Sequence, residues 1–123
     1  MIVDDDPAFI SQLTNILVER GYLVLGAKDG KAALDLLNQR EFDFSLAIID
    51  IFMPMGGGFE LIAELSANKA NMKIIAVSMG RQTVFNKAIS LGADPGVKKP
   101  ALGSALDARQ WITEVFSQIG MPE

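Results

Sequence analysis

Acidic, hydroxyl and basic side chains follow four short apolar runs of the sequence. Asp4-Asp5-Asp6 comes directly after Ile2-Val3, Asp50 ends a second run, Ser78 a third, and Lys98-Lys99-Pro100 follows a fourth. Each group alone has an ordinary structural interpretation, such as a solvated face, a helix cap or a charged turn. Their recurrence at the ends of four runs indicates one shared site.

Together these residue types suit the transfer of a phosphoryl group. Carboxylates placed close together repel one another unless a cation or a proton intervenes. Oxygen ligands without histidine or cysteine suit Mg²⁺, which commonly bridges to a phosphate. A carboxylate can attack a phosphoryl group and form an aspartyl phosphate, while a metal, an ammonium and a hydroxyl stabilise the developing charge. We expect Mg²⁺ as the cofactor, with Lys99 and Ser78 supplying the ammonium and the hydroxyl.

The elements that would position these residues alternate between short apolar runs and helical periods. The pattern predicts strands over 2–3, 22–27, 45–49, 73–77 and 96–98. It predicts helices over 8–19, 31–40, 58–66, 83–91 and 102–119. This alternation is typical of an α/β fold of the flavodoxin-like type, a doubly wound five-stranded parallel sheet covered on both faces.

The expected strand order is 2-1-3-4-5, in which the first and third strands are neighbours. Ligands of such sheets bind beyond the carboxyl ends of the strands, where the strand order reverses. Asp5 and Asp50 should therefore converge at that edge, with Ser78 and Lys99 on the far side of Asp50.

Length and composition exclude several classes of protein. A chain of 123 residues fits one domain, expected over 1–123. It has no histidine and no cysteine, which excludes a Ser-His-Asp triad, a histidine-ligated metal and a disulfide framework. A net charge of −4 argues against direct binding of nucleic acid. No apolar run approaches the ~20 residues of a membrane span, and the acidic start does not match a signal peptide. We expect a cytoplasmic location and no membrane partner.

At these residues the sequence resembles a response-regulator receiver domain of two-component signal transduction, of the chemotaxis-regulator type. The resemblance covers essentially the whole chain. Each matching segment is short, but they occur in the order and spacing of the family. The segments are Ile2-Val3-Asp4-Asp5-Asp6-Pro7, Ile48-Ile49-Asp50-Ile51-Phe52-Met53-Pro54, Gly58-Phe59-Glu60-Leu61, Ile74-Ile75-Ala76-Val77-Ser78, Gly92-Ala93-Asp94 and Lys98-Lys99-Pro100.

The resemblance implies a role for each residue of the site. Asp50 would be the phosphoacceptor, with Ser78 as the switch hydroxyl and Lys99 contacting the phosphoryl group. Mg²⁺ would be bound by Asp5, by Asp50, by the backbone carbonyl of Phe52 and, through water, by Asp4. Family members often hold the corresponding Lys–Pro bond cis, so the resemblance extends this expectation to Lys99–Pro100.

The same resemblance implies partners. A histidine kinase or a histidine phosphotransfer protein would supply the phosphoryl group, and a downstream protein or output domain would receive the signal. The domain would assist its own phosphorylation and dephosphorylation without being a multiple-turnover enzyme. The first strand is shorter than the usual 5–6 residues. We therefore expect a trimmed chain or a late start, and both a stand-alone regulator and a receiver cut from a larger protein stay open.

The sequence departs from the family pattern beside the site. Gly96 stands where the family usually has an aromatic residue that moves on activation, and Met79 follows the hydroxyl where a small residue is usual. These departures keep an alternative open, a degenerate receiver that acts as a constitutive protein-interaction module. A small phosphatase with an aspartate nucleophile is disfavoured, because Phe52 occupies the place of that enzyme's second aspartate.

Overall fold

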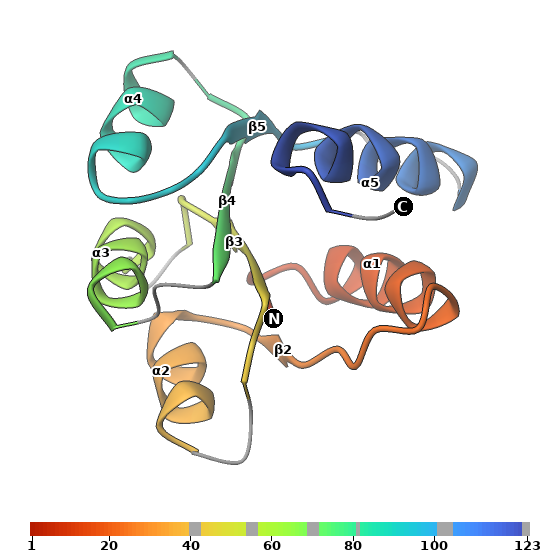
Figure 1. Cartoon of the computed structure of the whole chain (residues 1–123), viewed down its shortest axis with the longest axis horizontal. Helices are drawn as coiled ribbons and strands as arrows, with labels where there is room; N and C mark the ends of the chain where they lie inside the picture. The colour runs from red at the N-terminus through yellow and green to blue at the C-terminus, as the bar shows by residue number, and fades with distance from the viewer. Residues whose placement is uncertain (40–42, 54–56, 69–71, 81, 101–104, 122–123) are drawn as a thin grey trace.

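A five-stranded parallel sheet forms the centre of the molecule (Figure 1). The computed structural model describes residues 1–39, 43–53, 57–68, 72–80, 82–100 and 105–121. The strands are β1 (Ile2–Val3), β2 (Gly26–Ala27), β3 (Leu46–Asp50), β4 (Lys73–Ser78) and β5 (Gly96–Lys98). They lie in the order β2-β1-β3-β4-β5 and pair in parallel. The predicted fold class and strand order are confirmed.

Helices cover both faces of the sheet in the described part of the chain. They are α1 (Pro7–Glu19), α2 (Gly30–Asn38), α3 (Gly58–Asn68), α4 (Gln82–Ser90) and α5 (Ala105–Ile119). Figure 1 shows α1 and α5 on one side of the sheet and α2, α3 and α4 on the other. None of the described helices is long and apolar enough to cross a membrane.

Each face of the sheet carries its own apolar core, because successive side chains of a strand point to opposite faces. Ile48 and Val77 pack with Phe116 on the side of α1 and α5. Ile49 and Ala76 face the other core, under α2, α3 and α4. β3 is buried along its whole length. The strand that ends at Asp50 is therefore fixed between two packed layers.

Helix α1 begins where the local sequence predicts a helix start. The side chain of Asp6 accepts a hydrogen bond from the backbone nitrogen of Ala8, and Pro7 lies in the first turn. The helix ends at Glu19, and Gly21 follows with a φ of +93°, a conformation that favours glycine. These signals turn the chain sharply after the aspartates and hold them at the sheet edge.

The predicted strand over 22–27 is wrong in length, since β2 contains only Gly26–Ala27. β2 is the edge strand, and its partner β1 offers only two residues for pairing, with Ile2 opposite Gly26 and Val3 opposite Ala27. The carbonyl of Leu25 still accepts a hydrogen bond from the backbone nitrogen of Ile2, but the paired residues begin at Gly26. The short first strand therefore limits the second.

Other predicted boundaries match the structure or differ from it by at most two residues. The exceptions are the end of the second helix at residue 40 and the start of the fifth at residue 102, which lie outside the described residues. The expected cis bond is wrong, because the Lys99–Pro100 peptide is trans in this structure.

Candidate functional site

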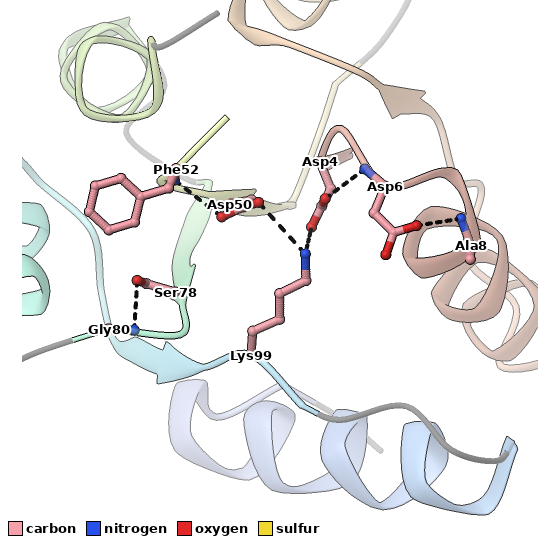
Figure 2. Close-up of polar contacts among 8 residues, drawn as sticks. All are labelled: Asp4, Asp6, Ala8, Asp50, Phe52, Ser78, Gly80 and Lys99. Atoms are coloured by element: carbon pink, nitrogen blue, oxygen red, sulfur yellow. Dashed lines mark hydrogen bonds and ion pairs between the residues drawn. The ribbon is translucent and has the colours of Figure 1, made fainter. Parts of the chain in front are cut away.

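Neighbouring strands bring the aspartates together at the carboxyl edge of the sheet (Figure 2). Asp4 follows β1 and Asp50 ends β3, and the register between these strands places Val3 opposite Ile49. Carboxylate oxygens of Asp4, Asp5 and Asp50 all lie within 4.8 Å of one another. The predicted convergence of Asp5 and Asp50 is thus seen in the geometry, with Asp4 as a third member.

Among the three consecutive aspartates at positions 4–6, Asp4 is the buried one and has no exposed surface. Its Oδ1 accepts a hydrogen bond of 2.9 Å from the backbone nitrogen of Asp6. Its Oδ2 lies 2.9 Å from Nζ of Lys99 and, within the described residues, accepts no well-aligned hydrogen bond. Burial raises the pKa of Asp4. Asp5 is exposed.

Asp50 is buried at the end of β3, with 7% of its surface exposed. Its Oδ1 accepts a hydrogen bond of 3.2 Å from the backbone nitrogen of Phe52, and its Oδ2 lies 3.7 Å from Nζ of Lys99. Burial and the nearby charge of Asp4 raise the pKa of Asp50 to about 6. The negative charge of the carboxylates therefore exceeds the positive charge that Lys99 supplies.

Lys99 extends from the end of β5 to both buried carboxylates (Figure 2). Its backbone nitrogen donates to the carbonyl of Ser78 at 2.9 Å, which fixes the start of the side chain beside β4. Its Nζ also lies 4.8 Å from the centre of the Phe9 ring, within the range of cation–π attraction. Burial alone would lower the pKa of Lys99, but its close contact with Asp4 and the charges of Asp4 and Asp50 raise it.

Ser78 is buried at the end of β4, and its hydroxyl points to its own loop. Oγ accepts a hydrogen bond of 3.0 Å from the backbone nitrogen of Gly80. Among the contacts drawn in Figure 2, none joins this hydroxyl to Asp50. The structure therefore places Ser78 at the predicted edge without bringing its hydroxyl into contact with the acid.

Two long apolar side chains flank the site without entering it. The side chain of Phe52 is exposed, and so is that of Met79, with 60% and 67% of their surfaces accessible. The side chain of Met79 is therefore largely in contact with solvent. Lys98 is exposed, and its backbone carbonyl accepts a hydrogen bond from the indole nitrogen of Trp111.

Two aromatic contacts could not be foreseen from the motifs. Phe9, a buried residue near the start of α1, contacts the ammonium of Lys99 through its ring. Phe85 of α4 packs against Gly96, the position at which the sequence lacks the usual aromatic residue. The only sequence signal for the contact of Phe9 with Lys99 was the position of Phe9 soon after the aspartates. No signal indicated the contact of Phe85 with Gly96.

Chemically, the arrangement offers oxygen ligands for a hard cation and an ammonium for an anion. Buried carboxylates with raised pKa values gain from a divalent cation, because it offsets both repulsion and lost hydration. Histidine and cysteine are absent from the chain. The site thus suits a magnesium-type ion and a phosphoryl group.

Comparisons with known proteins agree with this chemistry. A family model described as the response regulator receiver domain matches residues 1–110. Response regulator GtcR of Aneurinibacillus migulanus is 36% identical over 100 residues, covering 81% of this chain and 40% of that protein. Response regulator SaeR of Staphylococcus aureus is 31% identical over 103 residues, covering 81% of this chain and 43% of that protein. The chain spans less than half the length of these relatives.

Solved structures give the same result. A CheY-like receiver domain protein from Methanospirillum hungatei is similar with a TM-score of 0.77 and 30% identity, covering 97% of this chain and 94% of that chain. A response regulator from Burkholderia pseudomallei, solved with a phosphorylated aspartic acid, a calcium ion and citrate, has a TM-score of 0.74 and 26% identity. That match covers 98% of this chain and 73% of the other.

The sequence match and the geometry coincide in the same part of the chain. The matched residues 1–110 include the whole cluster from Asp4 to Lys99. The strand order that brings this cluster together is the one expected from the family resemblance. The chain therefore belongs to the family of response regulator receiver domains.

Proposed function

We propose that residues 1–123 act as a single receiver domain that accepts a phosphoryl group on Asp50. The observation that carries this proposal is the position of Asp50. It is buried at the end of β3, its carboxylate lies within 4.8 Å of those of Asp4 and Asp5, and its Oδ2 lies 3.7 Å from Nζ of Lys99. A histidine kinase or a histidine phosphotransfer protein would be the donor. A downstream protein or an output domain would receive the signal.

The residues present fit Mg²⁺. Three carboxylates converge, and Oδ2 of Asp4 is a buried oxygen that lacks a well-aligned donor in the described residues. Asp5, Asp50 and the backbone carbonyl of Phe52 would hold the ion directly, and Asp4 would do so through water. When bound, the ion supplies positive charge that neutralises the carboxylates and the incoming phosphoryl oxygens.

Transfer would form one bond and break another. A carboxylate oxygen of Asp50 attacks the phosphorus of a phosphohistidine, the new O–P bond replaces the P–N bond, and the imidazole leaves with its electron pair and gains a proton from solvent. Lys99 offsets charge on the phosphoryl oxygens, for which it is already placed 3.7 Å from Asp50. Ser78 would turn from Gly80 to donate to the same group.

The product would be an aspartyl phosphate on the protein itself, which is later hydrolysed. The domain is therefore not proposed as a multiple-turnover enzyme. Phosphorylation adds about −1.5 to −2 charge if an aspartyl phosphate behaves like other phosphorylated side chains. The added charge would draw Ser78 and Lys99 toward Asp50 and shift the population of the loops that carry them.

The degenerate receiver is the second candidate, and Gly96 is the feature that favours it. This alternative predicts that Mg²⁺ binds but that no phosphoryl group is accepted.

Intact-mass measurement after incubation with a small acyl phosphate and Mg²⁺ separates the two candidates. We expect one added phosphoryl group, absent after Asp50→Asn and absent without Mg²⁺. Asp35→Asn, which changes an exposed carboxylate on α2, is the matched control and should label normally. If the unsubstituted chain also stays unlabelled with a phosphorylated phosphotransfer protein as donor, the proposed function is wrong.

A further inference from the structure

The ammonium of Lys99 contacts an aromatic ring as well as two carboxylates. Nζ lies 2.9 Å from Oδ2 of Asp4, 3.7 Å from Oδ2 of Asp50 and 4.8 Å from the centre of the Phe9 ring, over which it is placed. The side chain of Lys99 is only 19% exposed. A cation over a ring is attracted more strongly where little water surrounds it. The ring of Phe9 is therefore an uncharged binding partner of the ammonium.

The two carboxylates have other tasks in the proposed function, whereas the ring has none. Mg²⁺ would offset the negative charge of Asp4 and Asp50, and the phosphoryl group would be bonded to Asp50. Both changes weaken the attraction between the carboxylates and the ammonium, because that attraction depends on their charge. The contact with the Phe9 ring does not depend on the charge of a carboxylate. It therefore persists while the charges of the site change.

Trp111 holds the Phe9 ring in place from the neighbouring helix. The two ring centres are 5.9 Å apart and the ring planes meet at 71°, which is an edge-to-face arrangement. Both side chains are buried. Phe9 belongs to α1 and Trp111 to α5, the two helices that share one side of the sheet (Figure 1). Since interiors are closely packed, the Phe9 ring cannot turn away without displacing Trp111.

The same tryptophan fixes the backbone from which Lys99 extends. Its Nε1 donates a hydrogen bond of 3.1 Å to the carbonyl of Lys98. The nitrogen of the same peptide group, which belongs to Lys99, donates to the carbonyl of Ser78 at 2.9 Å. Both polar atoms of this peptide group are thus engaged. The Lys99 side chain is held at its base by this peptide group and at its tip by Phe9.

We propose that Phe9, braced by Trp111, is a positioning residue that keeps the Lys99 ammonium beside Asp50 while the ion and the phosphoryl group engage the carboxylates. The proposal rests on the proposed phosphorylation of Asp50 and adds the residue that orients its ammonium. Phe9 acts through Lys99 and not by contact with the reacting atoms. Its effect comes from the negative charge on the face of the ring. The effect therefore falls when that charge is withdrawn, even in a ring of nearly the same size.

Fluorine atoms on the ring test this proposal, because they withdraw charge from the face and change the size of the ring little. Phenylalanine that carries one, two or three fluorine atoms is placed at position 9, and Phe9→Leu removes the ring. Position 116 is the matched control. Phe116 is buried in the same core, and its ring lies 5.9 Å from the guanidinium carbon of Arg20, a cation outside the candidate site. Intact mass gives the rate of labelling by an acyl phosphate at saturating Mg²⁺.

We expect the logarithm of the labelling rate to fall with each fluorine atom at position 9. Three fluorine atoms should slow labelling about tenfold, a loss within the range of a cation–π contact with little water around it. Phe9→Leu should label as slowly, and the fluorine series decides the matter if this variant does not fold. Three fluorine atoms at position 116 should leave the rate unchanged. A ring that only fills the core would give no graded loss.

The proton shifts of the ε-methylene group of Lys99 give a second readout that does not depend on labelling. A ring beside this group moves its proton shifts upfield. We expect the upfield displacement in the unsubstituted chain to persist when Mg²⁺ is added, and to be absent in the spectrum of Phe9→Leu. Persistence would show that the ring keeps the ammonium after the ion has engaged the carboxylates.

Two results would overturn this inference and leave the proposed function intact. They are equal labelling rates across the fluorine series and an upfield displacement that vanishes when Mg²⁺ is added. Absence of labelling in the unsubstituted chain, with an acyl phosphate and with a phosphorylated phosphotransfer protein, would overturn the proposed function and this inference together. The unsubstituted chain and the fluorine series therefore distinguish the two failures.

Discussion

Asp4 and Asp50 are two buried acids that depend on the same ammonium. Lys99 lies 2.9 Å from the first and 3.7 Å from the second, and their mutual repulsion helps to keep the pKa of Asp50 near 6. The sequence predicted that Asp50 and Lys99 lie at strand ends, and the structure has them there. The sequence did not show that Asp4, rather than Asp5, is the buried neighbour, because three consecutive aspartates after a short strand carry no periodicity that orients them.

Removing the ammonium should therefore be costly. Lys99→Ala leaves two buried carboxylates without their cation. We expect the free energy of unfolding to fall by about 3 kcal/mol, the lower value for breaking a buried ion pair. The loss is limited because Asp4 can take up a proton. Lys98→Ala is the control, since Lys98 is exposed and should change stability by less than about 0.5 kcal/mol. Urea unfolding at pH 7 without divalent cation measures both.

If the two lysine variants lose equal stability, the assignment of the site lysine is wrong. The same pair also tests labelling. Lys99→Ala should slow phosphorylation of Asp50 by more than tenfold, whereas Lys98→Ala should leave the rate unchanged.

The amino group of Met1 gives a second prediction for a preparation that begins at this residue. It is buried and donates to the carbonyl of Leu46 at 2.8 Å, and burial lowers its pKa from 8.0 to about 6. Between these values the unfolded chain holds a proton that the folded chain lacks, so stability rises as the pH increases from 6 to 8. Two pKa units correspond to roughly 2–3 kcal/mol.

Chemical unfolding at pH 6, 7 and 8 measures this rise. The same series with Asp50→Asn is the control, because the raised pKa of Asp50 acts in the opposite direction below about pH 6. Stability that stays flat or falls from pH 6 to 8 in both chains would contradict the burial of the amine.

At the scale of the elements, the alternation of strands and helices could be predicted, but close contacts between them could not. The buried strand β3 follows from its apolar run, and the start of α1 follows from its capping residues. The extent of β2 depends on how many residues β1 offers, which is a tertiary property. In the same way, the sequence shows that residue 96 lacks a side chain but not that Phe85 fills its place.

Helix α3 provides a test of such a contact. A Cβ atom on Gly58, its first residue, would lie 2.7 Å from the backbone Cα of Ile51. Gly58→Ala should therefore displace the helix or the strand end beside Asp50 and cost roughly 1–3 kcal/mol. The measurement is the thermal midpoint together with the rate of Asp50 labelling.

Gly30→Ala is the matched control, because Gly30 is the first residue of α2 and its nearest neighbour would be 3.4 Å away. It should be neutral or slightly stabilising. Equal effects of the two substitutions would show that the contact with Ile51 does not limit the position of α3.

At the scale of the whole molecule, two packed layers cover the faces of the sheet and leave the carboxyl ends of its strands to form the site. Asp4, Asp50, Ser78 and Lys99 come from four different strand ends, so their positions depend on the entire strand order. A ligand at that edge should therefore stabilise the complete fold. The chain spans less than half the length of the relatives above.

Binding of Mg²⁺ should raise the thermal midpoint of the whole chain. At a concentration 100 times its dissociation constant, a ligand of the folded state adds about 2.7 kcal/mol. We expect chelation to remove this gain and Asp5→Asn to reduce it strongly. Asp6→Asn is the control, because Asn preserves the cap of α1 and Asp6 does not belong to the converging group. If the thermal midpoint of the chain, measured first without calcium and magnesium, does not move when Mg²⁺ is added, the proposed ion site is contradicted.

Locating the phosphoryl group on the chain tests the central claim most directly. After labelling, borohydride converts a phosphorylated aspartate to homoserine, and peptide mass spectrometry identifies the altered position. Our account predicts homoserine at position 50 in the labelled chain and none in the unlabelled one. Homoserine at position 4 or 5, with position 50 unchanged, would contradict it.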